Sequence, residues 1–198
     1  MLFNHVFLSN SLKSDDPNAF VAANKIVRKV QHQSVTLRFH RDFDISSCYV
    51  VSFTDASFAN LPNAGSQGSY ITLLIDQNGL YSPLAWQSRK VRRVVKSTIA
   101  AECLAAVEAA EVTIYTAHLI MDVMRFSTLP KTYVFCDNKN LVKAAHSSTN
   151  IEDKRLIIDV SILRDLLERK ELTEFIWVPT EDQLANALTK QGAQINFC

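Results

Sequence analysis

The spacing of apolar residues changes along the chain, and each spacing predicts one kind of element. Apolar positions three or four residues apart predict helices over 17–33, 139–145 and 153–169. A longer helix is expected to begin at Ser97 or Thr98, because either side chain can cap its first turn. Its apolar face is formed by Ile99, Cys103, Ala106, Val107, Ala110, Ile114, Ala117 and Met121. The helix over 17–33 is amphipathic, and we expect its apolar stripe to dock on another surface.

Runs of β-branched and aromatic residues predict five strands. They cover 48–54, 69–75, 80–87, 132–136 and 173–178. The first run ends at Asp55, and the residues over 60–69 are rich in Asn, Pro, Gly and Ser, which predicts a loop. The sequence Asp76-Gln77-Asn78-Gly79 separates the second run from the third and is typical of a tight hairpin turn.

The order of these elements predicts the fold class. Pro179 ends the fifth strand, and Asp182 is expected to cap a last helix that runs to about Lys190. The order is then βββαβααβα, which predicts an α/β fold with a five-stranded mixed sheet, three antiparallel strands followed by two parallel ones, and helices on both faces. With 198 residues and 47% hydrophobic content, the chain can close one core. We expect an extension over 1–46, one domain over 47–192 and a tail over 193–198.

Cysteine spacing and hydropathy narrow the class of protein. Cys48, Cys103, Cys136 and Cys198 lie far apart and form no Cys-x-x-Cys pair, so they are expected to be reduced rather than to bind zinc or form disulfides. No run approaches the roughly 18 uninterrupted apolar residues of a membrane helix. We therefore expect a soluble intracellular protein, in the cytoplasm or the nucleus, without a membrane partner.

Charge is balanced over the chain but concentrated in one segment. The formal net charge is +1, so the whole chain gives no sign of a polyanionic partner. Five cations nevertheless lie within eight positions just before the long helix: Arg89, Lys90, Arg92, Arg93 and Lys96. This basic segment is the best candidate for phosphate contacts, which would weaken steeply with salt. The alternative is an ordinary solvated charged loop.

Three carboxylates occupy positions that the predicted fold brings together. Asp55 ends the first strand, Asp137 ends the fourth strand, and Glu102 lies in the first turns of the long helix. Hydrolysis of a phosphodiester needs charge neutralised on the attacking and leaving oxygens, and carboxylates that hold divalent cations supply this. Taken singly, such acids more often serve as helix caps or solvated surface residues.

Several short motifs occur in a fixed order around these acids. They are Phe53-Thr54-Asp55-Ala56-Ser57-Phe58-Ala59, Ala85-Trp86-Gln87-Ser88-Arg89-Lys90, Ser97-Thr98-Ile99-Ala100-Ala101-Glu102, Cys136-Asp137-Asn138-Lys139, Trp177-Val178-Pro179 and Gln183-Leu184-Ala185-Asn186-Ala187-Leu188-Thr189-Lys190. Together these segments resemble the ribonuclease H family, and most closely its branch in Ty1/copia-type retrotransposons, over about 22–193.

The resemblance implies a ribonuclease H-like fold and metal-dependent cleavage of the RNA strand of RNA–DNA hybrids. It implies two Mg²⁺ ions, with Mn²⁺ as an alternative, shared by four catalytic positions: Asp55, Glu102, Asp137 and Asn186. The first three are expected to bind metal. The fourth departs from the family, which has Asp there, and an amide keeps an acceptor oxygen but loses the charge. A metal bound at Asn186 is therefore expected to be held more weakly.

The resemblance also implies candidate binding partners for this chain. The residues over 1–46 resemble the end of the reverse-transcriptase region that precedes this domain in such polyproteins, which makes that domain a candidate partner beside the RNA–DNA hybrid. Ser57 and Asn138 are close to the catalytic candidates and are expected either to bind a sugar hydroxyl or to stabilise turns. Trp86 and Trp177 are predicted to be packing anchors.

Three functions remain open from the sequence. The first is an active ribonuclease H fragment of a retroelement. The second is a catalytically silent remnant that still binds nucleic acid, motivated by Asn186. The third is a structural or protein-interaction module in which the acids are incidental.

Asp182 lies one helical turn before Asn186 and is either a substitute metal ligand or the helix cap.

Overall fold

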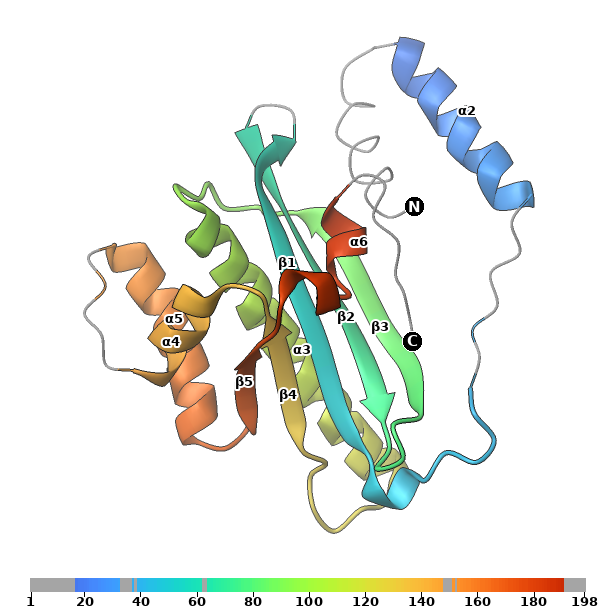
Figure 1. Ribbon diagram of the computed structural model, residues 1–198, viewed down its shortest axis with the longest axis vertical. Coiled ribbons are helices and arrows are strands. Elements are labelled where there is room, and N and C mark those ends of the chain that lie inside the picture. The colour runs from blue at the N-terminus through green and yellow to red at the C-terminus, as the bar shows by residue number, and fades with distance from the viewer. Residues whose placement is uncertain are drawn as a thin grey trace.

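Five strands form one mixed sheet in the order β3-β2-β1-β4-β5 (Figure 1). The computed structural model describes residues 17–32, 37, 39–61, 64–147, 151 and 153–190. The strands are β1 Tyr49–Leu61, β2 Gly65–Ile75, β3 Tyr81–Lys90, β4 Thr132–Cys136 and β5 Glu174–Trp177. The first three pair antiparallel, and β1–β4 and β4–β5 pair parallel. The predicted α/β class and strand arrangement are confirmed.

The helices follow the predicted order along the chain. They are α2 Pro17–His32, α3 Thr98–Met124, α4 Lys139–His146, α5 Lys154–Glu168 and α6 Asn186–Thr189, with short 3₁₀ turns at Ile45–Ser47 and Thr180–Asp182. Figure 1 shows α3, α4 and α5 on one side of the sheet and α6 on the other. Helices therefore cover both faces, but the second face carries only one turn of helix in the described part of the chain.

Small residues let α3 lie close against the sheet. Ser97 caps the helix by accepting a hydrogen bond from the amide of Ala100 at 3.3 Å. Ala101 and Ala105 pack on Ala56 of β1 in one buried cluster. At Gly68 of β2, an added Cβ would lie 3.3 Å from the Cβ of Ala105, so this position needs a glycine or a displaced helix. This close approach fixes the distance between α3 and the centre of the sheet.

By length and composition, α3 could also cross a membrane. Its most apolar window has a mean hydropathy of 1.3, and 56% of that window is buried inside the fold. The buried residues include Cys103, Ala106 and Ala110, which belong to the main core. A core helix of a globular fold passes the same test, and this packing accounts for the apolar sequence of α3.

The first strand and the loop after it differ from the prediction. β1 does not end at Asp55 but continues to Leu61, and β2 begins at Gly65, inside the predicted loop over 60–69. The ladder continues because Ala56 pairs with Gly68 and Ser57 pairs with Gln67. Small and polar residues have low strand propensity, but backbone pairing with a neighbouring strand outweighs it here.

The end of the domain also differs from the prediction. Asp182 does not cap a helix but lies exposed in a 3₁₀ turn, and α6 begins only at Asn186. Buried Gln183 organises this turn instead: its side-chain oxygen accepts from the amide of Ala185 at 3.2 Å, and its side-chain nitrogen donates to the Phe135 carbonyl at 3.3 Å. An amide that both donates and accepts satisfies this site, whereas a carboxylate only accepts.

Helix α2 confirms the predicted amphipathic helix but not its docking. Phe20 is 63% exposed and Val27 is 52% exposed, and Figure 1 shows the helix apart from the sheet. Ala23 and Ile26 of the same stripe are half-buried, so the stripe is exposed only in part. The predicted domain bounds at 47 and 192 stay a prediction, and the tail over 193–198 lies outside the described residues.

Candidate functional site

Parallel pairing of β1 with β4 brings two of the predicted acids together. The register pairs Thr54 with Cys136, so Asp137, which follows the end of β4, comes next to Asp55, which lies within β1. Ala56 faces α3, and because successive side chains of a strand alternate, Asp55 faces the side that carries α6. Glu102 lies in the second turn of α3, and its ligand atom is within 4.8 Å of that of Asp137. Burial raises the pKa of the Glu102 carboxyl, and the charges of Asp137 and Asp55 raise it further.

The tightest part of the cluster contains Cys136, which the sequence analysis did not count among the site residues. Potential ligand atoms of Glu102, Cys136 and Asp137 all lie within 4.8 Å of one another. Burial raises the pKa of the Cys136 thiol, so that side chain stays protonated and neutral. Asp55 lies beside this group, and its Oδ2 accepts a hydrogen bond from the Thr189 hydroxyl.

Burial makes the charged state of the cluster costly. Asp55 is 3% exposed and Glu102 is 9% exposed. The Oε2 atom of Glu102 has no hydrogen-bond partner among the described residues. Burial raises the pKa of Glu102 to about 7, opposed by a hydrogen bond from Asn138 and by the charge of Lys190. Burial likewise raises the pKa of Asp55. A buried carboxylate with an unused acceptor atom needs a cation or a proton.

The available donor atoms fit a hard divalent cation. Asp55, Glu102 and Asp137 offer carboxylate oxygens, which are the ligands that Mg²⁺ and Mn²⁺ prefer. The neutral thiol of Cys136 is a poor ligand for such ions, so its place is in the wall of the site. The unpartnered Glu102 Oε2 supplies the acceptor that a bound ion would use.

Asp137 is held by two neighbours that the sequence analysis did not identify. Thr180 donates its hydroxyl to Asp137 Oδ2 at 3.0 Å, and the indole of Trp177 donates to the Asp137 carbonyl at 3.0 Å. Lys139 lies over the Trp177 ring, with Nζ 4.0 Å from its centre. These contacts fix the carboxylate at the end of β4. The sequence Trp177-Val178-Pro179-Thr180 contains both donors, but nothing in it specifies that they bond Asp137.

The two tryptophans are not packing anchors. Trp86 is 44% exposed and Trp177 is 37% exposed. Trp177 instead holds the Asp137 backbone, and Trp86 lies on β3 at the edge of the sheet. The prediction was wrong because large aromatics on strands most often fill cores, and an edge strand offers less cover.

Asn186 is bound within its own segment. Its Nδ2 donates to the Thr180 carbonyl at 2.6 Å, and its Oδ1 accepts from Lys190 Nζ at 2.5 Å. The Thr180 hydroxyl in turn donates to Asp137, so Thr180 connects Asn186 to the acid cluster. Both polar atoms of the amide are therefore engaged by protein groups.

The two candidate sugar contacts have different local roles. Asn138 caps α4, because its Oδ1 accepts from the amides of Asn140 and Leu141 at 3.0 Å each. It also bonds Glu102, as the pKa effect shows. Ser57 is half-buried in β1. The turn-stabilising role predicted as one alternative for Asn138 is thus present, and the sugar contacts stay a prediction.

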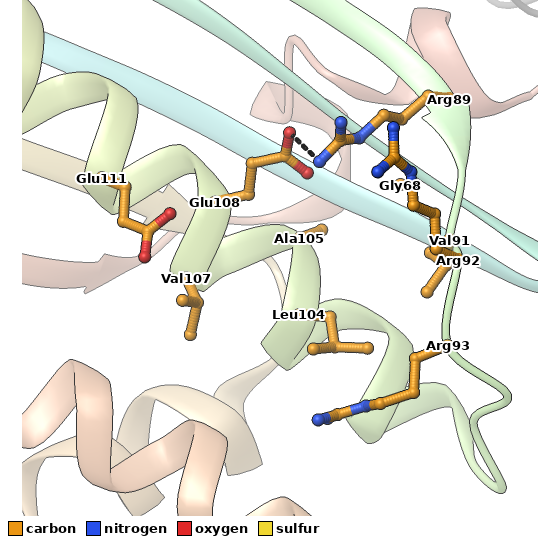
Figure 2. Close-up of a pocket in the computed structure, with 10 residues that line it drawn as sticks. All are labelled: Gly68, Arg89, Val91, Arg92, Arg93, Leu104, Ala105, Val107, Glu108 and Glu111. Atoms are coloured by element: carbon orange, nitrogen blue, oxygen red, sulfur yellow. Dashed lines mark ion pairs between the residues drawn. The ribbon is translucent and has the colours of Figure 1, made fainter.

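The basic segment is divided between internal ion pairs and exposed cations. Figure 2 shows Arg89 reaching Glu108 on α3, an ion pair of 2.6 Å, while Arg93 points the other way. Arg93 pairs with Asp159 of α5. No salt bridge to Lys90, Arg92 or Lys96 occurs among the described residues. Arg92 helps to line a pocket of about 270 Å³ between β3 and α3. Of the five cations predicted to contact phosphate, Lys90, Arg92 and Lys96 therefore form no salt bridge in the described part of the chain.

Comparison with solved structures identifies the fold. LC11 RNase H1, isolated from compost by a metagenomic approach, matches with a TM-score of 0.52 at 15% identity, over 71% of this chain and 91% of that chain. A structure of LC11 RNase H1 in complex with RNA/DNA hybrid matches with a TM-score of 0.51 at 16% identity, over 70% and 92%. The fold is ribonuclease H-like. No protein-family model matches the sequence, and no curated protein matches it significantly.

Replacing Arg93 should destabilise the fold. Asp159 is 4% exposed, so Arg93→Met leaves a buried carboxylate without its cation, which we expect to cost about 3 kcal/mol of unfolding free energy. Urea denaturation measures the difference. Arg92→Met, a neighbouring exposed arginine without a salt bridge, is the control and should change stability by under about 0.5 kcal/mol. Equal effects of the two substitutions would contradict a structural role for the Arg93–Asp159 pair.

Replacing Glu102 should stabilise the protein only at high pH in the presence of EDTA. The pKa of Glu102 is about 7 in the fold against an ordinary 4.5, so between these values the native state binds more protons than the unfolded state. Its stability therefore falls as pH rises from 4.5 to 7. Glu102→Gln removes this loss, and its advantage should grow from near zero at pH 4 to about 3 kcal/mol at pH 8.

Urea denaturation at both pH values measures this advantage. Glu111→Gln, the same change at an exposed position of α3, is the matched control. The explanation fails if Glu102→Gln and wild type differ by the same amount at pH 4 and pH 8.

Proposed function

We propose that this chain is a ribonuclease H that hydrolyses the RNA strand of RNA–DNA hybrids. One observation carries the proposal: a buried Glu102 carboxylate, one oxygen of which has no hydrogen-bond partner in the described part of the chain, lies beside Asp55 and Asp137 on a ribonuclease H-like sheet. Acids that only capped helices would be solvated or hydrogen-bonded. The partner class is supported by the fold neighbour LC11 RNase H1, which is known in complex with RNA/DNA hybrid.

The residues of the site have distinct roles in this proposal. Asp55, Glu102 and Asp137 would hold the divalent cation, Mg²⁺ or Mn²⁺. The bound cation would neutralise charge on the phosphate and help to activate water. The Thr180 hydroxyl donates to Asp137 and the Thr189 hydroxyl donates to Asp55. Because both carboxylates are held in this way, neither needs to reorient to bind the cation. The buried wall formed by Cys136 keeps water from the inner side of the cluster.

The basic segment and the N-terminal region supply the wider context. Lys90, Arg92 and Lys96 would contact phosphates of the hybrid without reading sequence. Ser57 and Asn138 would approach the sugars. The order of the motifs supports an origin in a Ty1/copia-type retrotransposon polyprotein, with a reverse-transcriptase domain as partner and an intracellular location. The exposed stripe of α2, which includes Phe20 and Val27, is consistent with such a partner.

A second function is favoured by one residue. Asn186 replaces the acid that the retrotransposon pattern has in the closing helix, and both of its polar atoms are occupied by Thr180 and Lys190. A chain that binds the hybrid but cleaves slowly or not at all would fit this arrangement. Activity measurements on matched variants separate the two functions.

Cleavage of a labelled RNA–DNA hybrid in Mg²⁺ and in Mn²⁺ tests the proposal. We expect wild-type cleavage, a loss of about 100-fold or more in Asp137→Asn, because the cluster loses a metal ligand, and a gain of about 10-fold in Asn186→Asp. Asp122→Asn, which changes an exposed acid in the last turns of α3, is the matched control and should cleave like wild type.

The other outcomes decide between the functions. Hybrid binding without cleavage in wild type, with cleavage restored in Asn186→Asp, would identify a silenced nuclease. Binding without cleavage by either protein would favour the binding function. Cleavage that survives Asp137→Asn undiminished would contradict the role given to the acid cluster.

A further inference from the structure

Lys190 places a positive charge beside the acid cluster. It directly follows α6, and its Nζ donates to Asn186 Oδ1 at 2.5 Å, one helical turn back. Asn186 in turn donates to the Thr180 carbonyl, and the Thr180 hydroxyl donates to Asp137, while Thr189, the residue before Lys190, donates to Asp55. The ammonium is therefore part of the electrostatic environment of the cluster.

The backbone before Lys190 is held in place. Thr189 is 1% exposed, and its hydroxyl bonds Asp55. Leu188 packs on Ile71 and Leu73 of β2, and its carbonyl accepts from Gln67 Nε2 at 2.9 Å. Lys190 thus starts from a segment that is fixed against the sheet, and its exposed side chain is held by the hydrogen bond to Asn186.

The neutral side chain of Asn186 explains why the Lys190 ammonium, rather than a divalent cation, lies next to it. Asn186 is neutral, so it offers an acceptor to Lys190 but no charge to attract a divalent cation. On the other side, Glu102 Oε2 is buried without a partner. One unused acceptor remains among the carboxylates, while the Asn186 oxygen is already taken. The cluster therefore offers an acceptor to a divalent cation at Glu102, whereas the Asn186 acceptor already serves Lys190.

Building on the proposed nuclease function, we propose that the Lys190 ammonium occupies the Asn186 side of the site in place of a second divalent cation. The chain then takes up one divalent ion, held by Asp55, Glu102 and Asp137. Lys190 repels that ion and keeps another from binding at Asn186. Metal affinity and stoichiometry are set by the Asn186–Lys190 pair as well as by the acids.

Calorimetric titration of the full chain with Mn²⁺ tests this inference. Wild type should bind one ion. Lys190→Met keeps the length of the side chain without its charge and should bind one ion about 10-fold more tightly. The double variant Asn186→Asp with Lys190→Met should bind two ions. Lys143→Met removes a charge from an exposed position of α4 and is the control, with wild-type affinity expected.

The results separate this inference from the proposed function. Equal Mn²⁺ affinity of wild type and Lys190→Met, or two ions in wild type, would overturn the role of Lys190 while leaving hybrid cleavage unaffected. The expected titrations without hybrid cleavage would retain the role of Lys190 and reject the nuclease. Absence of Mn²⁺ binding by every variant would overturn both.

Discussion

The register between β1 and β4 is the constraint on which the site depends. Thr54 lies opposite Cys136, and the residues that follow them on the two strands are Asp55 and Asp137. Because the strands are parallel, Asp137 leaves β4 next to the point where Asp55 projects from β1. A shift of one residue would turn Asp55 toward α3, where Ala56 now packs against alanines, and would move hydrophobic residues out of the core. The same hydrophobic pattern that builds the core thus fixes the relative position of the acids.

Holding three acids together has an energetic cost, and the surrounding residues offset part of it. Burial raises the pKa of Asp55 and Glu102 above the ordinary values. Hydroxyl donors on two carboxylates and one nearby ammonium reduce that cost without removing it. The folded chain is therefore less stable than its core alone would make it, and a bound cation would recover stability. Such a trade between stability and function is common at sites that must bind charge.

The fold was more predictable from the sequence than the site. Apolar spacing specified α3 and α5, and the Asn-Gly turn specified the β2–β3 hairpin, because these signals are local. The strand after Asp55 was missed, since its stability comes from pairing with β2 rather than from its own residues. The acids were identified from their order, but the contacts of Thr180, Trp177 and Lys190 depend on how distant segments meet. No local pattern specifies those contacts.

The ion pair between Arg93 and Asp159 affects more than stability. Residues 91–97 connect β3 to α3 with no helix or strand of their own. Through Arg93 this connection is joined to α5, a helix more than 60 residues away in sequence. A loop held at Arg93 would lose less conformational entropy if a ligand bound it, so the neighbouring cations would be preorganised for the proposed phosphate contacts. The arginine that is least available for phosphate would thus lower the entropic cost of binding for its neighbours.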